Sequence, residues 1–180
     1  MQRLWSCPLT PEVYHQSEGH RQVRPEVRCP NCGSPAGLQR HGTYARWITT
    51  LVGTVLRLLV ARFLCRRCQR TISYLPDFAL SYRTVHAETL QAYLEGERAR
   101  RDVQTWQSVL RSYARRLQEW APTLIRTVGA AFGRAPPQPS RLWPWLKRAC
   151  GDVRAATRQL VTVFRISLLN RYQCHQPCRC

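Results

Sequence analysis

Two short motifs, CPNC at residues 29–32 and CRRC at residues 65–68, decide how this chain folds. Each motif places two thiols on one tight turn, and the segment between them is long enough to leave and return. Zn²⁺ prefers four nitrogen or sulfur ligands at the corners of a tetrahedron, and structural zinc sites fill all four positions. The pattern therefore predicts one structural zinc ion held by four thiolates, from Cys29, Cys32, Cys65 and Cys68.

The segment between the two motifs has the composition of a β-hairpin. Residues 43–50 (TYARWITT) and 55–64 (VLRLLVARFL) are rich in β-branched and aromatic side chains, and Gly53 lies in a turn sequence between them. Gly33 directly follows the first motif, where a tight turn needs a residue that tolerates positive φ. A cysteine turn, a hairpin and a second cysteine turn are the elements of a zinc ribbon. We therefore expect an α+β fold, with a small ribbon followed by an α-helical region.

Disulfide bonds are the alternative use of these thiols. The chain has nine cysteines, an odd number, and residues 1–32 contain no apolar signal sequence. Disulfides persist in oxidising compartments, which secreted proteins reach through such a signal. We therefore expect reduced, metal-binding thiols and a cytoplasmic location.

The chain is strongly basic, with 28 Lys and Arg residues against 10 Asp and Glu residues and a formal net charge of +18. Lys147 is the only lysine, and arginine donates two parallel hydrogen bonds to phosphate and also reads guanine edges. Nucleic acid is therefore the first partner to expect, most readily double-stranded DNA at the nucleoid, with structured RNA as a variant. An anionic membrane surface is the competing interpretation.

No segment is expected to span a membrane. The longest apolar run, residues 51–61, contains Arg57 and is far shorter than the ~20 residues that a transmembrane helix needs. The sequence therefore predicts a soluble protein.

Apolar spacing predicts helices after the hairpin, the first over residues 86–94 before Gly96. The clearest spans residues 102–120, with Asp102 as its N-cap and Pro122 just beyond its end. Its apolar residues recur at steps of three and four, which describes one buried stripe. The stripe consists of Val103, Trp106, Leu110, Tyr113, Leu117 and Trp120.

A second face of this helix is polar and contains no acidic residue. Arginine and glutamine side chains on such a face contact phosphates and bases when the helix lies in a major groove, and a solvated surface is the simpler explanation. We expect DNA contacts from this face, at Gln104, Ser108, Arg111, Arg115 and Gln118. We also expect them from the arginines around the cysteine motifs, at Arg40, Arg46, Arg62, Arg66, Arg67 and Arg70.

The predicted organisation is an arm, the ribbon, a helical DNA-binding region, a proline-rich linker and a C-terminal segment, at residues 1–28, 29–76, 77–132, 133–141 and 142–180. The arm is expected to be irregular, since Pro8, Pro11 and Pro25 disfavour a helix. A short helix is expected over residues 123–132. The C-terminal segment is expected to contain a helix over residues 153–169, with Asp152 as its N-cap, and a cysteine-rich tail.

Two other groups of metal-ligand residues are weaker candidates. Cys7, His15 and His20 are poorly spaced, and His41 is not needed where four thiolates complete the shell. The tail offers four ligands within seven residues but provides little scaffold, at Cys174, His175, Cys178 and Cys180. We therefore expect one zinc ion per chain.

Residues 29–120 resemble the N-terminal region of bacterial insertion-sequence transposases, and a small family of uncharacterised domains built on that region. The resemblance rests on CPNCGS, RHGTYAR and RFLCRRCQRTISYLPDF, followed by a YRT connector. In those relatives a zinc ribbon precedes a helix-turn-helix that binds transposon-end DNA. The resemblance implies that the four motif cysteines bind the metal and that residues 108–111 lie in the recognition helix.

Two features depart from that family. Residues 96–105 are short for a complete middle helix and turn. Full transposases continue into a catalytic domain in which three carboxylates hold two metal ions, whereas the acids beyond Glu97 are only Asp102, Glu119 and Asp152. We therefore predict a zinc-dependent DNA-binding protein of transposase origin, without catalytic residues. The alternatives are a truncated transposase that depends on a partner protein, and a zinc-ribbon protein–protein adaptor.

Overall fold

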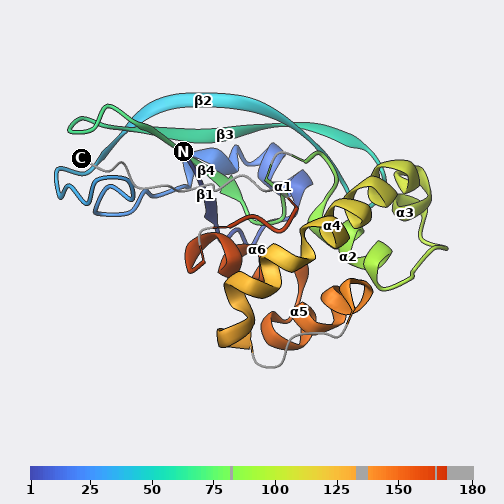
Figure 1. Cartoon of the computed structure of the whole chain (residues 1–180). Coiled ribbons are helices and arrows are strands. Elements are labelled where there is room, and N and C mark those ends of the chain that lie inside the picture. The colour runs from blue at the N-terminus through green and yellow to red at the C-terminus, as the bar shows by residue number, and fades with distance from the viewer. Residues whose placement is uncertain (82, 133–137, 165, 170–180) are drawn as a thin grey trace.

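The computed structural model describes residues 1–81, 83–132, 138–164 and 166–169, which form a mixed α+β structure as predicted. A long β-hairpin arches over one side of the molecule, and the larger helices lie beneath it (Figure 1). The two cysteine turns lie at one end of this hairpin, and the turn between its strands lies at the other end, near α3 (Arg101–Thr105).

The sheet contains β1 (Gln2–Trp5), β2 (Leu38–Thr49), β3 (Val55–Cys65) and β4 (Thr71–Pro76), in the order β1-β4-β3-β2. β1 runs parallel to β4, and the other neighbouring strands are antiparallel. The predicted hairpin is confirmed, because β2 and β3 pair from Leu38 and Cys65 down to Thr49 and Val55. The sheet is larger than the expected ribbon, since β1 and β4 extend it on the β3 side.

The N-terminal arm is not irregular, which corrects the expectation. Besides β1 it contains a helix and a 3-10 turn, α1 (Pro11–Gln16) and η1 (Gly19–Arg21). Pro11 takes the first helical position, where its missing N–H would have no intrahelical partner anyway. Thr10 caps the helix by accepting the Val13 N–H at 3.3 Å. Tyr14 then packs into the core under the sheet, so the arm is part of the same structure.

The helices of the described residues are α2 (Ala87–Leu94), α3 (Arg101–Thr105), α4 (Gln107–Phe132), α5 (Leu142–Cys150) and α6 (Val153–Thr162), with the 3-10 turn η2 (Pro139–Arg141) before α5. The helix expected over residues 86–94 is confirmed as α2, and His86 is its N-cap. Within the described part of the chain, no helix is long and apolar enough to cross a membrane.

The helix expected over residues 102–120 is corrected at both ends. The chain breaks at Trp106, between α3 and α4, and Pro122 lies inside α4 instead of beyond its end. Proline removes a backbone donor and crowds the preceding turn. Here its ring is exposed, and buried residues on the opposite stripe carry the packing across it, namely Leu117, Ala121, Leu124 and Val128. The separate helix expected over residues 123–132 is therefore the second half of α4.

Asp102 is not a helix cap. It lies inside α3, whose N-cap is Arg100, and its carboxylate is buried. The Thr89 hydroxyl donates to it at 2.6 Å, and Arg100 donates at 2.9 Å, so Asp102 ties α3 to α2. Burial alone would raise the pKa of this carboxyl, but the hydrogen bonds from Arg100 and Thr89 hold the pKa below its ordinary value.

The helix expected over residues 153–169 is shorter in the structure. Asp152 is its N-cap as predicted and accepts the Ala155 N–H at 2.6 Å. The helix ends at Thr162, and the chain beyond it is held by tertiary contacts, since the Ser167 carbonyl accepts the indole N–H of Trp120 at 3.1 Å. The C-terminal helices share one apolar core with α2 and α4, so they are not a separate unit.

One buried carboxylate joins the helices to the sheet. Asp77 directly follows β4, and its oxygens accept from Arg154 at 2.6 Å and from Arg158 at 3.3 Å, both on α6. The backbone N–H of Cys7 donates to the same carboxylate at 3.2 Å. The arm, the sheet and α6 therefore meet at one charged cluster.

Candidate metal centre

The four motif cysteines come together at one end of the hairpin, and their sulfurs all lie within 4.8 Å of one another. The sulfurs of Cys29 and Cys68 are 3.8 Å apart, and those of Cys32 and Cys65 are 3.7 Å apart. With Zn–S bonds of about 2.3 Å, the sulfurs of a regular tetrahedron are about 3.8 Å apart. A disulfide needs about 2.05 Å. The geometry and the all-sulfur donor set therefore fit a tetrahedral metal ion such as zinc.

The two cysteine turns have the same backbone structure. In each, the residue after the second cysteine donates its N–H to the carbonyl of the first cysteine, at 2.8 Å from Gly33 and 2.9 Å from Gln69. These two residues also share a left-handed backbone, with φ of 70° at Gly33 and 55° at Gln69. A glycine was expected at this position only in the first turn. The second turn shows that this position requires a left-handed backbone but not a glycine, since Gln69 adopts the same conformation.

The surroundings of the sulfurs are those of a scaffold. Cys29 and Cys65 are buried, and both belong to a small apolar core with Phe63 and Ile72. The Asn31 side chain donates to the Cys68 sulfur at 3.3 Å, across the two turns. Donors around a ligating group fix its orientation. Asn31 had not been expected to contribute, because only its place inside the CPNC motif distinguishes it in the sequence.

The thiols differ in how readily they ionise. Burial raises the pKa of Cys29 to about 12, despite backbone N–H donors from Cys32 and Asn31. Burial also acts against ionisation at Cys68, but the Asn31 side chain and the Arg70 backbone N–H outweigh it and lower the pKa to about 7. Since the thiolate is the form that binds metal, Cys68 is more readily available as a ligand than Cys29.

The weaker metal candidates among the described residues are not joined by further ligand side chains. Within the described ranges, the cysteine tetrad is the only group of three or more His, Cys, Asp or Glu side chains placed to hold an ion. Cys7 is buried with its sulfur 4.0 Å from the Leu9 carbonyl, and His15 and His41 are exposed. The tail candidates Cys174, His175, Cys178 and Cys180 lie outside the described residues.

The two cysteine turns belong to a basic stretch of the chain. Residues 27–76 contain eight arginines and no acidic residue. Arg66, Arg67 and Arg70 of the second turn are exposed. Arg40 is exposed as well, but its guanidinium donates to the His20 carbonyl at 2.8 Å and lies over the Phe63 ring. Arg62 is half-buried on β3.

Arg46 has a different place from the other arginines of this group. It is half-buried, and its guanidinium donates to the backbone carbonyls of Leu80 and Arg83. Its described hydrogen bonds therefore hold the connector after β4 against the hairpin, inside the protein. The sequence could not separate this arginine from its neighbours, because strand alternation fixes its inward direction only once the register with β3 is known.

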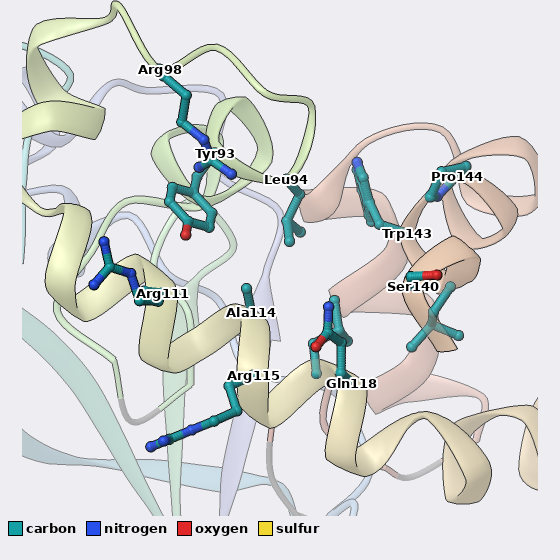
Figure 2. A pocket seen from close by; sticks show the side chains of 12 residues that line it. Tyr93, Leu94, Arg98, Arg111, Ala114, Arg115, Gln118, Ser140, Trp143 and Pro144 are labelled. Carbon is teal, nitrogen blue, oxygen red and sulfur yellow. The ribbon is translucent and has the colours of Figure 1, made fainter. Parts of the chain in front are cut away.

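The predicted polar face of the long helix is exposed, at Gln104, Ser108, Arg111, Arg115 and Gln118. Gln104 lies on α3 and the other four on α4. A single residue, Trp106, separates these helices, whereas a helix-turn-helix has a turn of about three to four residues. Figure 2 shows Arg111, Ala114 and Gln118 of α4 facing a hollow bordered by Tyr93, Leu94 and Trp143.

Residues 29–113 match the family model of a domain of unknown function, DUF6431. The match begins at the first cysteine of the tetrad, covers the hairpin, β4, α2 and α3, and ends in α4. It spans just under half of the chain. The chain matches no curated protein and no solved structure.

Proposed function

We propose that this protein is a DNA-binding protein whose basic loops are held by a structural zinc ion, and that it is not itself an enzyme. The observation that carries the proposal is the second cysteine turn, where Arg66, Arg67 and Arg70 are exposed within a stretch, residues 27–76, that contains no acidic residue. Phosphate contacts supply most of the affinity of basic proteins for DNA. A rigid thiolate site would hold the exposed Arg66 and Arg67 in a fixed position for such contacts.

Zinc has the role of a scaffold in this proposal. Four thiolates complete a tetrahedral shell, and structural sites of this kind contribute folding free energy on the order of 10 kcal/mol. The four cysteines would hold the ion, and the two turns would then project their arginines together. We infer that this unit is a zinc ribbon extended by β1 and β4.

The α2–α3–α4 region is the proposed source of any sequence preference. Ser108 and Arg111 lie in the first turns of α4, where base-reading side chains of a recognition helix are found. The short break at Trp106 makes this region more compact than a standard helix-turn-helix. The origin in a transposase rests on sequence resemblance alone.

Fluorescence anisotropy with labelled duplex DNA and zinc-loaded full-length protein tests the proposal. Replacing Arg66 and Arg67 together by glutamine should lower the slope of log affinity against log salt by about two, since two phosphate contacts are lost. The control variant replaces Arg126 and Arg148, which are exposed on α4 and α5, and removes the same charge. Equal losses in the two double variants would contradict phosphate binding centred on the cysteine turns.

A protein–protein adaptor is the second candidate, and one observation favours it. At the hairpin end far from the tetrad, apolar side chains are exposed, with Trp47 at 55 %, Val52 at 64 % and Val55 at 47 %. Exposed apolar groups of this kind mark interaction surfaces. Tight binding of a partner protein that Trp47→Ser abolishes, together with weak binding of DNA, would favour the adaptor.

A further inference from the structure

The polar face of α4 borders a groove instead of facing open solvent. The groove is open to solvent and has a volume of about 490 Å³, within the range of small-molecule sites. Its other walls come from α2, the loop after it and the start of α5, so that Tyr93, Arg98 and Trp143 stand across from Arg111, Ala114 and Gln118. These walls restrict how deeply this face of α4 can enter the major groove of a duplex, which is only about 12 Å wide.

The groove is positively charged, because three arginines and no carboxylate line it among the residues that the structure describes. The nearest acidic residues along the chain are already in ion pairs, Glu95 with Lys147 at 2.8 Å and Glu97 with Arg100 at 3.4 Å. Arg115 has only a long surface contact to Glu119, at 3.8 Å. Among the described residues, Arg98 and Arg111 have no ion-pair partner. An anion from outside the chain would therefore find cations that are not neutralised.

Arg98 is held in place by an aromatic ring. Its guanidinium lies over the ring of Tyr93, 3.5 Å from the centroid, and Figure 2 shows Arg111 rising from α4 beside the same ring. A guanidinium stacked on an aromatic face keeps its in-plane donors available for phosphate. The two arginines form the cationic, phosphate-binding end of the groove.

The rest of the groove has the character of a base-binding surface. Leu94, Ala114 and Trp143 give it apolar walls, and the amide of Gln118 offers both a donor and an acceptor. Arg111 and Gln118 are seven residues apart on one helix, which separates them by roughly 10 Å along its axis. That distance suits one nucleotide, with its phosphate at one end and its base at the other.

We propose that this groove binds a nucleoside monophosphate group, either the phosphorylated end of a nucleic-acid strand or a free nucleotide. Arg98 and Arg111 bind the phosphate, and the base lies along Leu94 and Ala114 with its edge at Gln118. The inference rests on the proposed function, which it deepens: the base recognition proposed for α4 is directed at a strand end instead of the major groove, while the cysteine turns bind the duplex.

The test compares three labelled DNAs by anisotropy with zinc-loaded full-length protein. The first is a duplex with a single-stranded overhang that ends in a phosphate, the second has the same overhang ending in a hydroxyl, and the third is a blunt duplex ending in hydroxyls. The wild type should bind the phosphorylated overhang about tenfold more tightly than the hydroxyl form, as expected for a charge-assisted bidentate contact. Arg111→Gln should abolish this preference, whereas Arg126→Gln, on the same helix outside the groove, should retain it.

Equal binding of the phosphorylated and hydroxyl overhangs by the wild type overturns the inference, as does an equal loss of preference in Arg126→Gln. Competition by dAMP distinguishes a strand end from a free nucleotide as the ligand. If dAMP displaces the phosphorylated overhang, a free nucleotide binds the groove; if it does not, the groove needs the strand end. Failure of the proposed function would give a different result: the protein would bind the phosphorylated overhang but not the blunt duplex. Blunt-duplex binding without a phosphate preference contradicts the inference alone.

Discussion

Gly33 has a role that its side chain, a single hydrogen, makes possible. It follows the second cysteine of the first turn with φ of 70°, and its N–H bonds to the Cys29 carbonyl at 2.8 Å. Gln69 adopts nearly the same backbone in the second turn, with φ of 55°, although it carries a Cβ. The left-handed conformation disfavours residues with a Cβ by about 1–2 kcal/mol.

Gly33→Ala should lower the free energy of unfolding by about 1 kcal/mol and leave zinc binding intact. No atom lies within 4 Å of a Cβ built at Gly33, so the loss is conformational and not steric. Urea unfolding of zinc-saturated protein measures it. Gly129→Ala is the control, since Gly129 lies in α4 with open space around it, and alanine there should stabilise by up to about 1 kcal/mol. Loss of zinc from Gly33→Ala would contradict this, because it would show that the first turn does not accept a side chain at the left-handed position, as the second turn does at Gln69.

His86 couples the stability of the protein to pH. It is buried, its ring stacks on Phe78 with centroids 5.8 Å apart, and its Nδ1 accepts the Glu88 N–H at 3.1 Å as the cap of α2. Burial, followed by the positive charge of Arg154, lowers the pKa of His86 to about 4. An unfolded histidine titrates near 6.5. Between these values the unfolded state binds the extra proton, so stability is complete above about pH 6.5 and falls as the pH drops towards 4.

The variant His86→Asn should remove this dependence, because asparagine can also cap a helix but does not titrate. Between pH 7 and pH 4, the wild type should lose on the order of 3 kcal/mol more stability than the variant. Chemical unfolding of both proteins across this range measures the difference, and acid effects on the cysteines or on His20 are common to both. Parallel pH profiles would contradict the assignment of a buried, neutral His86.

Among the elements, the hairpin was the easiest to predict, and the reasons are local. β-branched residues, the Gly53 turn and the two cysteine motifs all indicate the same structure, and β2 and β3 follow it. The tetrad was predictable for the same reason, since a CxxC motif fixes two ligands by itself. Residues 38–42, at the start of β2, lacked the strand composition and were missed.

The helices were harder to predict, because their limits depend on tertiary contacts. Pro122 would end an isolated helix, but α4 continues past it with its opposite stripe packed on the core. Trp106 fits the apolar stripe, yet the helix breaks there. The groove was not predicted at all, since it forms only when the start of α5 meets α2 and α4.

The cysteine turns behave as one element only when all four ligands are present. Cys65→Ser should release the metal and unfold this end of the sheet, because Cys65 is both a ligand and part of the core there. Zinc measured per chain, together with circular dichroism, tests this. Cys150→Ser is the control, since Cys150 is half-buried in α5 away from the tetrad and should keep one zinc. A wild type that folds fully without metal would refute the scaffold role, and two zinc ions per chain would assign a second site outside the described residues.

For the whole molecule, Asp77 is the group that joins its parts. Asp77→Ala would leave Arg154 and Arg158 without their buried acceptor and should destabilise the protein by about 3–5 kcal/mol in urea unfolding. Glu119→Ala removes an acid from an exposed pair with Arg115 and should change stability by less than about 1 kcal/mol. Similar small losses in both variants would mean that α6 and the sheet are held together without Asp77.

The net charge of the whole chain, +18, favours binding of DNA phosphates by the zinc-held basic surface. The most direct test is the affinity of zinc-loaded protein for duplex DNA at increasing salt concentration. If several phosphates are contacted, log affinity should fall linearly with log salt, by about 0.9 for each contact, with a total slope of about −4 or steeper. Removal of zinc should weaken this binding. An affinity that hardly changes with salt, or that is the same without zinc, would contradict phosphate binding by a zinc-held surface.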